Sequence, residues 1–111
     1  MAEYDAAIAE LELAITELRL SIRKDVSEAL LDINIAKTHY LSNVERTKLN
    51  RERLRAIKVR RKVNQATESD VALIRREFRQ SEVDQRVSAI DLIHKTVIYH
   101  LKIGKILLKE V

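Results

Sequence analysis

The stretch RRKVNQATESDVALI, residues 60–74, interrupts a chain whose apolar spacing is otherwise that of long helices. Within it, Asn64 is the residue that most readily adopts the left-handed conformation that ends a helix where glycine is missing. Thr67 or Ser69 can cap a following helix, and the acidic residues beside them suit the positive end of its dipole. The stretch therefore predicts a chain reversal at residues 64–69, with one uninterrupted helix as the alternative.

The composition favours an all-α protein. Of the 111 residues, 46% are hydrophobic and 34% are charged, and the chain has no proline, no cysteine, no tryptophan and a single glycine. This mixture is typical of long helices and lacks the residues that punctuate strands and tight turns. We expect one domain over residues 1–111, a long antiparallel two-helix coiled-coil hairpin with helices at about residues 3–63 and 69–111.

Apolar residues in the first helix recur at alternating steps of four and three, which is typical of a heptad seam against a partner helix. The strong part of this seam is Tyr4, Ile8, Leu11, Ile15, Leu18, Ile22, Val26, Ala29, Ile33, Ala36, Tyr40 and Val44. It continues weakly through Thr47, Leu54, Ile57 and Val63. The second helix begins its seam with Val71, Ile74 and Phe78 and is predicted to change phase near Ser81. From there the predicted seam is Val83, Val87, Ile90, His94, Val97, Leu101, Gly104, Leu108 and Val111.

The two predicted helices differ in length. At 1.5 Å per residue they span about 90 Å and about 65 Å, so residues 3–20 overhang the end of the second helix. Large apolar side chains left exposed there would each forfeit about 1.5–3 kcal/mol of burial. We therefore expect another chain, or a missing partner region of a larger protein, to cover the overhang. The predicted self-association seam is Tyr4, Ile8, Leu11, Ile15 and Leu18.

The residues do not predict an enzyme. His39, His94 and His100 are not spaced to form a helix-borne metal pair, and no glycine-rich loop could cradle a phosphate. We expect no catalytic residues, no cofactor, no metal and no small-molecule ligand. No run is apolar enough to span a bilayer.

Charge is distributed unevenly, with eight acidic and three basic side chains in residues 1–32 but two acidic and nine basic ones in residues 45–62. The nine are Arg46, Lys48, Arg51, Arg53, Arg55, Lys58, Arg60, Arg61 and Lys62. A basic block is most often a solvated helix surface, but it can also bind nucleic acid, anionic lipid or an acidic protein face. One alternative is therefore a basic coiled-coil arm that binds nucleic acid, although base-stacking aromatic residues are missing there. A self-associating helical scaffold is another.

Two segments have a familiar spacing. VSEALLDINIAKTHYL carries Val26, Ala29, Leu31, Asp32, Ile33 and Ala36, and VRRKVNQATESDV carries Arg60, Asn64, Thr67, Glu68, Asp70 and Val71. With the return segment RVSAIDLIHKTVIYHLKIGKILL they resemble, over roughly residues 20–108, one α-helical hairpin of the TolC-type outer membrane factors, or outer membrane efflux proteins. That family favours glycine where Asn64 stands and an aromatic residue where Leu30 stands. Its barrel strands have no counterpart here.

The resemblance implies a structural role in transport. In the family, helices of three subunits form an α-barrel across the periplasm for multidrug efflux or type I secretion, and the hairpin tips dock a periplasmic adaptor (membrane fusion) protein. By this resemblance Asn64 ends the outgoing helix and Asp70 caps the return helix. The implied partner-binding tip is Arg60, Arg61, Val63, Asn64, Gln65, Ala66, Thr67, Glu68, Ser69 and Asp70.

The resemblance also implies a location. The chain would be the periplasmic portion of an outer membrane protein and would work as part of a homo-oligomer, a trimer in the parent duct. Without the resemblance, the acidic start and the lack of a basic, apolar leader favour the cytoplasm.

The overhang can be tested by Leu11→Asp. We expect the change to weaken self-association far more than it lowers helicity, because Leu11 lies on a seam with no partner in its own chain. Light scattering and circular dichroism of both variants make the comparison. A wild-type chain that stays monomeric would contradict the prediction.

Overall fold

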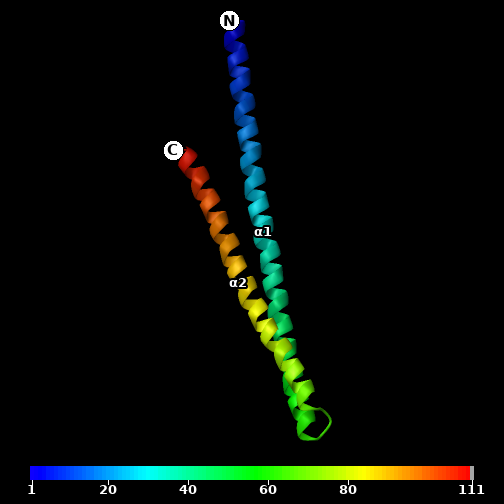
Figure 1. The fold of residues 1–111 in the computed structure, drawn as a ribbon. Coiled ribbons are helices and arrows are strands. Elements are labelled where there is room, and N and C mark those ends of the chain that lie inside the picture. Colours follow the sequence, from blue (N-terminus) through cyan, green and yellow to red (C-terminus); the bar gives the residue numbers. More distant parts are fainter. Residues whose placement is uncertain (111) are drawn as a thin grey trace.

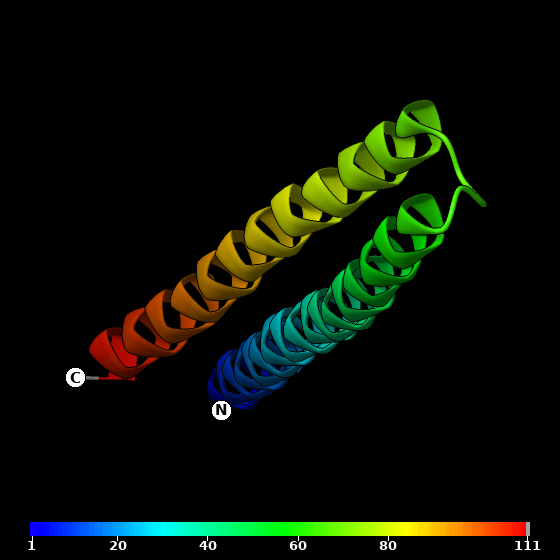
Figure 2. The same ribbon diagram turned by 90° about the horizontal axis from the view of Figure 1, so that it is seen from below.

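A computed structural model describes the backbone of residues 1–110 and the side chains of residues 1–108. These residues form two antiparallel helices, α1 over Ala2–Lys62 and α2 over Glu68–Glu110, in a rod of 94 × 21 × 15 Å (Figure 1). Seen from the turn, the helices lie side by side (Figure 2). The predicted all-α hairpin is confirmed, and both helix starts and the end of α1 lie within one residue of those expected. Val111, the last residue of the predicted second seam, lies outside the described residues.

The predicted seam of α1 faces α2 along the paired part of the rod. Its buried members Ala29 and Ala36 are each 3% exposed, and the larger seam residues between and on either side of them are half-buried. Two alanines at a spacing of seven let the helix axes approach closely, while the residues beside them fill the edges of the contact. The half-buried members are Ile22, Val26, Ile33, Tyr40 and Val44.

The predicted change of phase in α2 does not occur. The helix keeps the phase of Val71 and continues it through Ser81 and Ser88, which are 2% and 8% exposed. Their hydroxyls donate to carbonyls of the same helix, at Phe78 (2.7 Å) and Gln85 (2.9 Å). A small side chain whose polar atom is satisfied within its own helix allows close packing without an apolar surface.

The residues predicted as the second seam lie outside the helix pair instead. We call Val83, Val87, Ile90, His94, Val97, Leu101, Gly104 and Leu108 the outer stripe of α2. Its large apolar members are 49–78% exposed. Each lies two residues from a position that faces α1, such as Ser81, Gln85 or Ser88. Two residues rotate a helix by about 200°. The outer stripe therefore points away from α1. The prediction was wrong because apolar spacing identifies a seam but not the helix that it meets.

The apolar core of the hairpin is concentrated near the turn. Leu54, Ile57 and Val71 are buried there, and Ala66, Ile74 and Phe78 pack against them. The guanidinium of Arg51 lies 5.8 Å from the centre of the Phe78 ring, in the range of a cation–π contact. Burial of each large side chain contributes about 1.5–3 kcal/mol, so this cluster stabilises the reversal that the turn begins.

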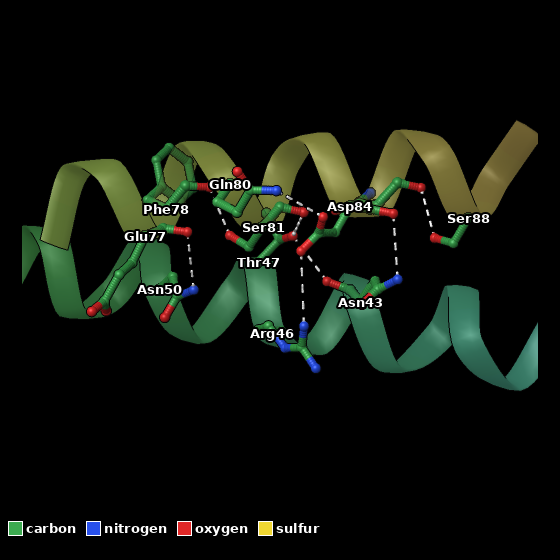
Figure 3. A network of polar contacts seen from close by, with 11 residues as sticks. Asn43, Arg46, Thr47, Asn50, Glu77, Phe78, Gln80, Ser81, Asp84 and Ser88 are labelled. Atoms are coloured by element: carbon green, nitrogen blue, oxygen red, sulfur yellow. Dashed lines mark hydrogen bonds and ion pairs between the residues drawn. The ribbon is translucent and has the colours of Figure 1, made fainter.

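Farther from the turn, polar side chains of α1 reach the backbone of α2 (Figure 3). Three side chains donate to carbonyls: Asn43 to Asp84 (3.3 Å), Thr47 to Ser81 (3.1 Å) and Asn50 to Glu77 (3.5 Å). Ion pairs between Arg46 and Asp84 (4.0 Å) and between Arg53 and Glu77 (3.0 Å) flank them. A polar side chain between two helices is satisfied only if its hydrogen-bond partner lies at the same height along the other helix. This network therefore sets the register of the two helices.

Beyond the network the helices separate, and α2 leans away from α1 toward its C-terminal end (Figure 1). A cleft of about 450 Å³ opens between them, with Leu18 and Ile22 on one side and Lys102, Lys105 and Ile106 on the other. The hairpin is therefore tightest at the turn and loosest at the far end of α2.

The contribution of the apolar cluster can be measured with Ile57→Ala. Ile57 is 8% exposed, so we expect a loss of about 2–4 kcal/mol in the free energy of unfolding from lost burial and the cavity left behind. Val59→Ala is the matched control, because Val59 is 61% exposed two residues away, and we expect a change within about 0.5 kcal/mol. Urea unfolding followed by circular dichroism compares them. Equal losses for the two variants would contradict the assigned core.

Candidate docking surfaces

The end of α1 is closed by a left-handed residue. Asn64 has φ 63°, the conformation expected from the sequence. The N–H of Asn64 donates to the carbonyl of Arg61 (3.1 Å), and that of Gln65 donates to the carbonyl of Arg60 (2.8 Å). These two bonds form a Schellman motif, which satisfies carbonyls that the helix end would otherwise leave unpaired. Asparagine takes the place of the usual glycine because its side chain tolerates this conformation.

The start of α2 is capped by Thr67. Its hydroxyl accepts a hydrogen bond from the N–H of Asp70 (3.2 Å), and the Asp70 carboxylate accepts one from the N–H of Thr67 (2.9 Å). This reciprocal pair is a capping box with aspartate in the acidic position. The Thr67 backbone N–H, then its hydroxyl and then the charge of Arg60 lower the pKa of Asp70. Asp70 therefore completes the cap that Thr67 makes.

The tip residues implied by the family resemblance surround this turn, but they do not all face outward. Ala66 is half-buried against the apolar cluster, Thr67 and Asp70 are engaged with each other, and Arg61 forms an ion pair with Glu68. Four of the remaining residues are exposed and lack such a contact in the described part of the chain. They are Arg60, Val63, Gln65 and Ser69.

Positive charge gathers beside the tip. A shallow groove of about 450 Å³ is lined by Lys58, Arg61, Lys62, Arg75 and Val71. Of these four basic residues, Arg61 alone has a carboxylate within ion-pair distance among the described side chains. Arg75 was not among the predicted tip residues. Because Arg75 follows Val71 by four residues, the two lie on the same face of α2, and this spacing could have predicted the position of Arg75 beside the tip.

The overhang of α1 is uncovered in the hairpin. Its five seam residues are 44–75% exposed, although their spacing is that of a buried seam. An exposed apolar surface of this size and regularity is typical of a site of protein association. These residues are Tyr4, Ile8, Leu11, Ile15 and Leu18.

Both helices also carry apolar residues on the side that faces away from the partner. In α2 this is the outer stripe. In α1 the residues Leu13, Leu20, Leu31 and Leu49 are 58–60% exposed and are separated by 7, 11 and 18 residues, which are near-integral numbers of helical turns. α1 therefore presents one apolar face to α2 and a second to the outside. α2 meets α1 through apolar residues only near the turn and through small polar residues beyond it, and its long apolar stripe faces outward.

Other kinds of site find little support in the described residues. Among the described side chains, those of residues 1–108, no cluster of three or more His, Asp or Glu could hold a metal ion. Over the same residues, neither helix combines the length and apolar character needed to cross a membrane. His94 lies on the outer stripe and His100 packs edge-on against Tyr99, with ring centres 5.5 Å apart.

The chain matches no protein-family model, no curated protein and no solved structure.

The conformation of Asn64 can be tested with two substitutions. Asn64→Ala should lower the free energy of unfolding by about 1 kcal/mol, because alanine is strained at positive φ. Asn64→Gly should be neutral or slightly stabilising, since glycine adopts this conformation freely. Thermal unfolding of the three proteins measures both effects. If the glycine variant loses as much stability as the alanine variant, the Asn64 side chain matters for another reason.

Proposed function

We propose that the chain is a non-catalytic wall hairpin of a TolC-type export duct, with helices that pack between neighbouring helices and a tip that docks a periplasmic adaptor. The observation that carries the proposal is the pair of opposite faces on each helix, one packed against the partner helix and one apolar and exposed.

Opposite faces favour a layer over a compact bundle. A helix in a bundle buries one broad face toward a shared core. A helix with two narrow seams about 180° apart has a neighbour on each side, so its helices stand in a row that is one helix thick. A row of hairpins that curves until its edges meet is a hollow barrel. This is the wall that the resemblance in residues 20–108 implies, with three subunits contributing to it.

Charge at the tip indicates the kind of docking partner. The groove beside the tip brings Lys58, Lys62 and Arg75 together, and Arg60 and Gln65 are exposed nearby. An acidic segment of the adaptor fits this surface, and salt would weaken such a contact because the charges are exposed to solvent.

The same cations favour a second candidate, a coiled-coil arm that binds nucleic acid through its phosphates. Binding of that kind depends steeply on salt and needs no base-reading side chains. The exposed apolar faces have no role in it, so the duct accounts for more of the surface.

Photo-crosslinking at the tip tests the duct. A benzophenone amino acid in place of Gln65 should crosslink a purified periplasmic adaptor encoded in the same genome. The same substitution at Lys37, exposed midway along α1, is the matched control and should give no crosslink. Lys58→Glu combined with Arg75→Glu should reduce the Gln65 crosslink about tenfold, by removing the charges that attract an acidic partner.

Two outcomes would count against the duct. Equal crosslinking from positions 37 and 65 would mean that the tip has no special role. Absence of any crosslink, together with a gel shift of nucleic acid that disappears at moderate salt, would favour the nucleic-acid arm.

A further inference from the structure

We infer that the acidic overhang of α1 docks on the outer stripe of α2 in a second copy of this chain, and that two copies make this contact reciprocally as an antiparallel pair of hairpins. The inference does not rest on the proposed function. The pair would use the end of the outer stripe that a neighbouring hairpin would cover in a duct wall, so the two contacts are alternative states of the chain.

The two uncovered surfaces have identical spacing. Overhang and stripe residues correspond at a constant offset of 93 in sequence number. Helices whose apolar positions share the same steps can pack with every seam residue at the level of a partner. The offset pairs Tyr4 with Val97, Ile8 with Leu101, Leu11 with Gly104 and Ile15 with Leu108.

Gly104 supports this register independently. Glycine is unfavourable inside a helix, and nothing in the hairpin explains its presence, because a Cβ built there would meet no atom within 4 Å. In the proposed contact Gly104 lies opposite Leu11. A missing side chain at that level leaves room for the leucine between the two backbones.

Charge complementarity identifies the occupant. Residues 2–18 carry five acidic side chains and no basic one, whereas residues 92–108 carry three lysines and no acidic one. Opposite net charges on the two helix segments favour their association and oppose the pairing of two overhangs with each other, although Lys102 and Lys105 lie at the cleft between α1 and α2 and not on the outer stripe itself.

Symmetry gives the direction. Equal steps would allow the overhang to run along the outer stripe either way. If the two hairpins pointed the same way, each overhang would reach the next copy only after a shift along the rod, and such a contact repeats without closing. If they point in opposite directions, both contacts form at once about a twofold axis perpendicular to the rod.

The intrachain register allows this closure. Hydrogen bonds join Asn43 to Asp84, Thr47 to Ser81 and Asn50 to Glu77. A residue of α1 and a residue of α2 therefore lie at the same height along the rod when their numbers add to about 127 or 128. Continued along the rod, this register brings the far end of α2 level with about Leu18, and both Leu18 and Ile106 line the cleft there. Above that level the partner's α2 lies along the seam of α1 that its own α2 no longer covers.

Disulfide trapping tests the arrangement, because the chain has no cysteine of its own. Equimolar Ile8→Cys and Leu101→Cys proteins, mixed under mild oxidation, should form a crosslinked heterodimer. Each single variant alone should crosslink at least about tenfold less, since an antiparallel pair keeps like positions apart. A mixture of Ile8→Cys with Val87→Cys is the matched control on the same stripe, two heptads out of register.

A further mixture separates this pair from the wall of a duct. Hairpins that point the same way put Leu31 of one copy level with Val97 of the next, by the intrachain register. Crosslinking of Leu31→Cys with Val97→Cys, without crosslinking of Ile8→Cys with Leu101→Cys, would overturn the antiparallel pair and support duct-like neighbours. Failure of both mixtures would overturn the antiparallel pair and leave the tip crosslink to decide the proposed function.

Sedimentation gives an independent measurement. Leu101→Asp should weaken dimerisation of the 111-residue chain by about tenfold or more, because the side chain occurs in both copies of the contact. Val87→Asp should change it less than about twofold, since Val87 lies on the same stripe outside the contact. Both residues are exposed in the hairpin, so the helix content of both variants should match the wild type. A monomeric wild type, or equal effects of the two variants, would overturn the inference.

Discussion

The arrangement of the hairpin follows from the close approach of α1 and α2 at Thr47 and Ser81. Both residues are buried, and the Thr47 hydroxyl shares its hydrogen between the Ser81 carbonyl across the helix pair (3.1 Å) and the Asn43 carbonyl of its own helix (2.9 Å) (Figure 3). α2 has two possible contact faces, a small polar one that contains Ser81 and an apolar one two residues out of phase. Hydrogen bonds to α2 carbonyls are available only at short range, so the small face turns inward and the apolar face turns outward.

Because the small face of α2 turns inward, the apolar outer stripe of α2 stays exposed in the hairpin, as does the overhang of α1. The apolar cluster near the turn and the capped tip hold the reversal in place, while the separated end and the overhang expose side chains at regular heptad steps. A coiled-coil seam is stable when it is shared, and here it is shared along only part of α1. In both proposed assemblies, the helical wall and the antiparallel pair, a neighbouring chain covers these exposed seams.

Local interactions were predictable from the sequence because they depend on residues close together in the chain. Asn64 at a positive φ and the Thr67 cap follow from the few side chains that can end one helix and begin another without glycine or proline. The seam of α1 was predictable as well, since it is the strongest apolar stripe on that helix. Arg75 beside the tip and the place of Ala66 in the core were not assigned, because each depends on how the two helices meet.

From the residues alone one can predict that this chain is helical, where it reverses, and that its helices carry apolar stripes at a spacing of 3.5 residues. These properties arise from backbone preferences and from periodicity within single segments. Which stripe of α2 meets α1 is set by contacts between the two helices. That outcome depends on polar bonds between residues 27–41 positions apart and on the small size of Ser81 and Ser88, and neither contributes to an apolar pattern.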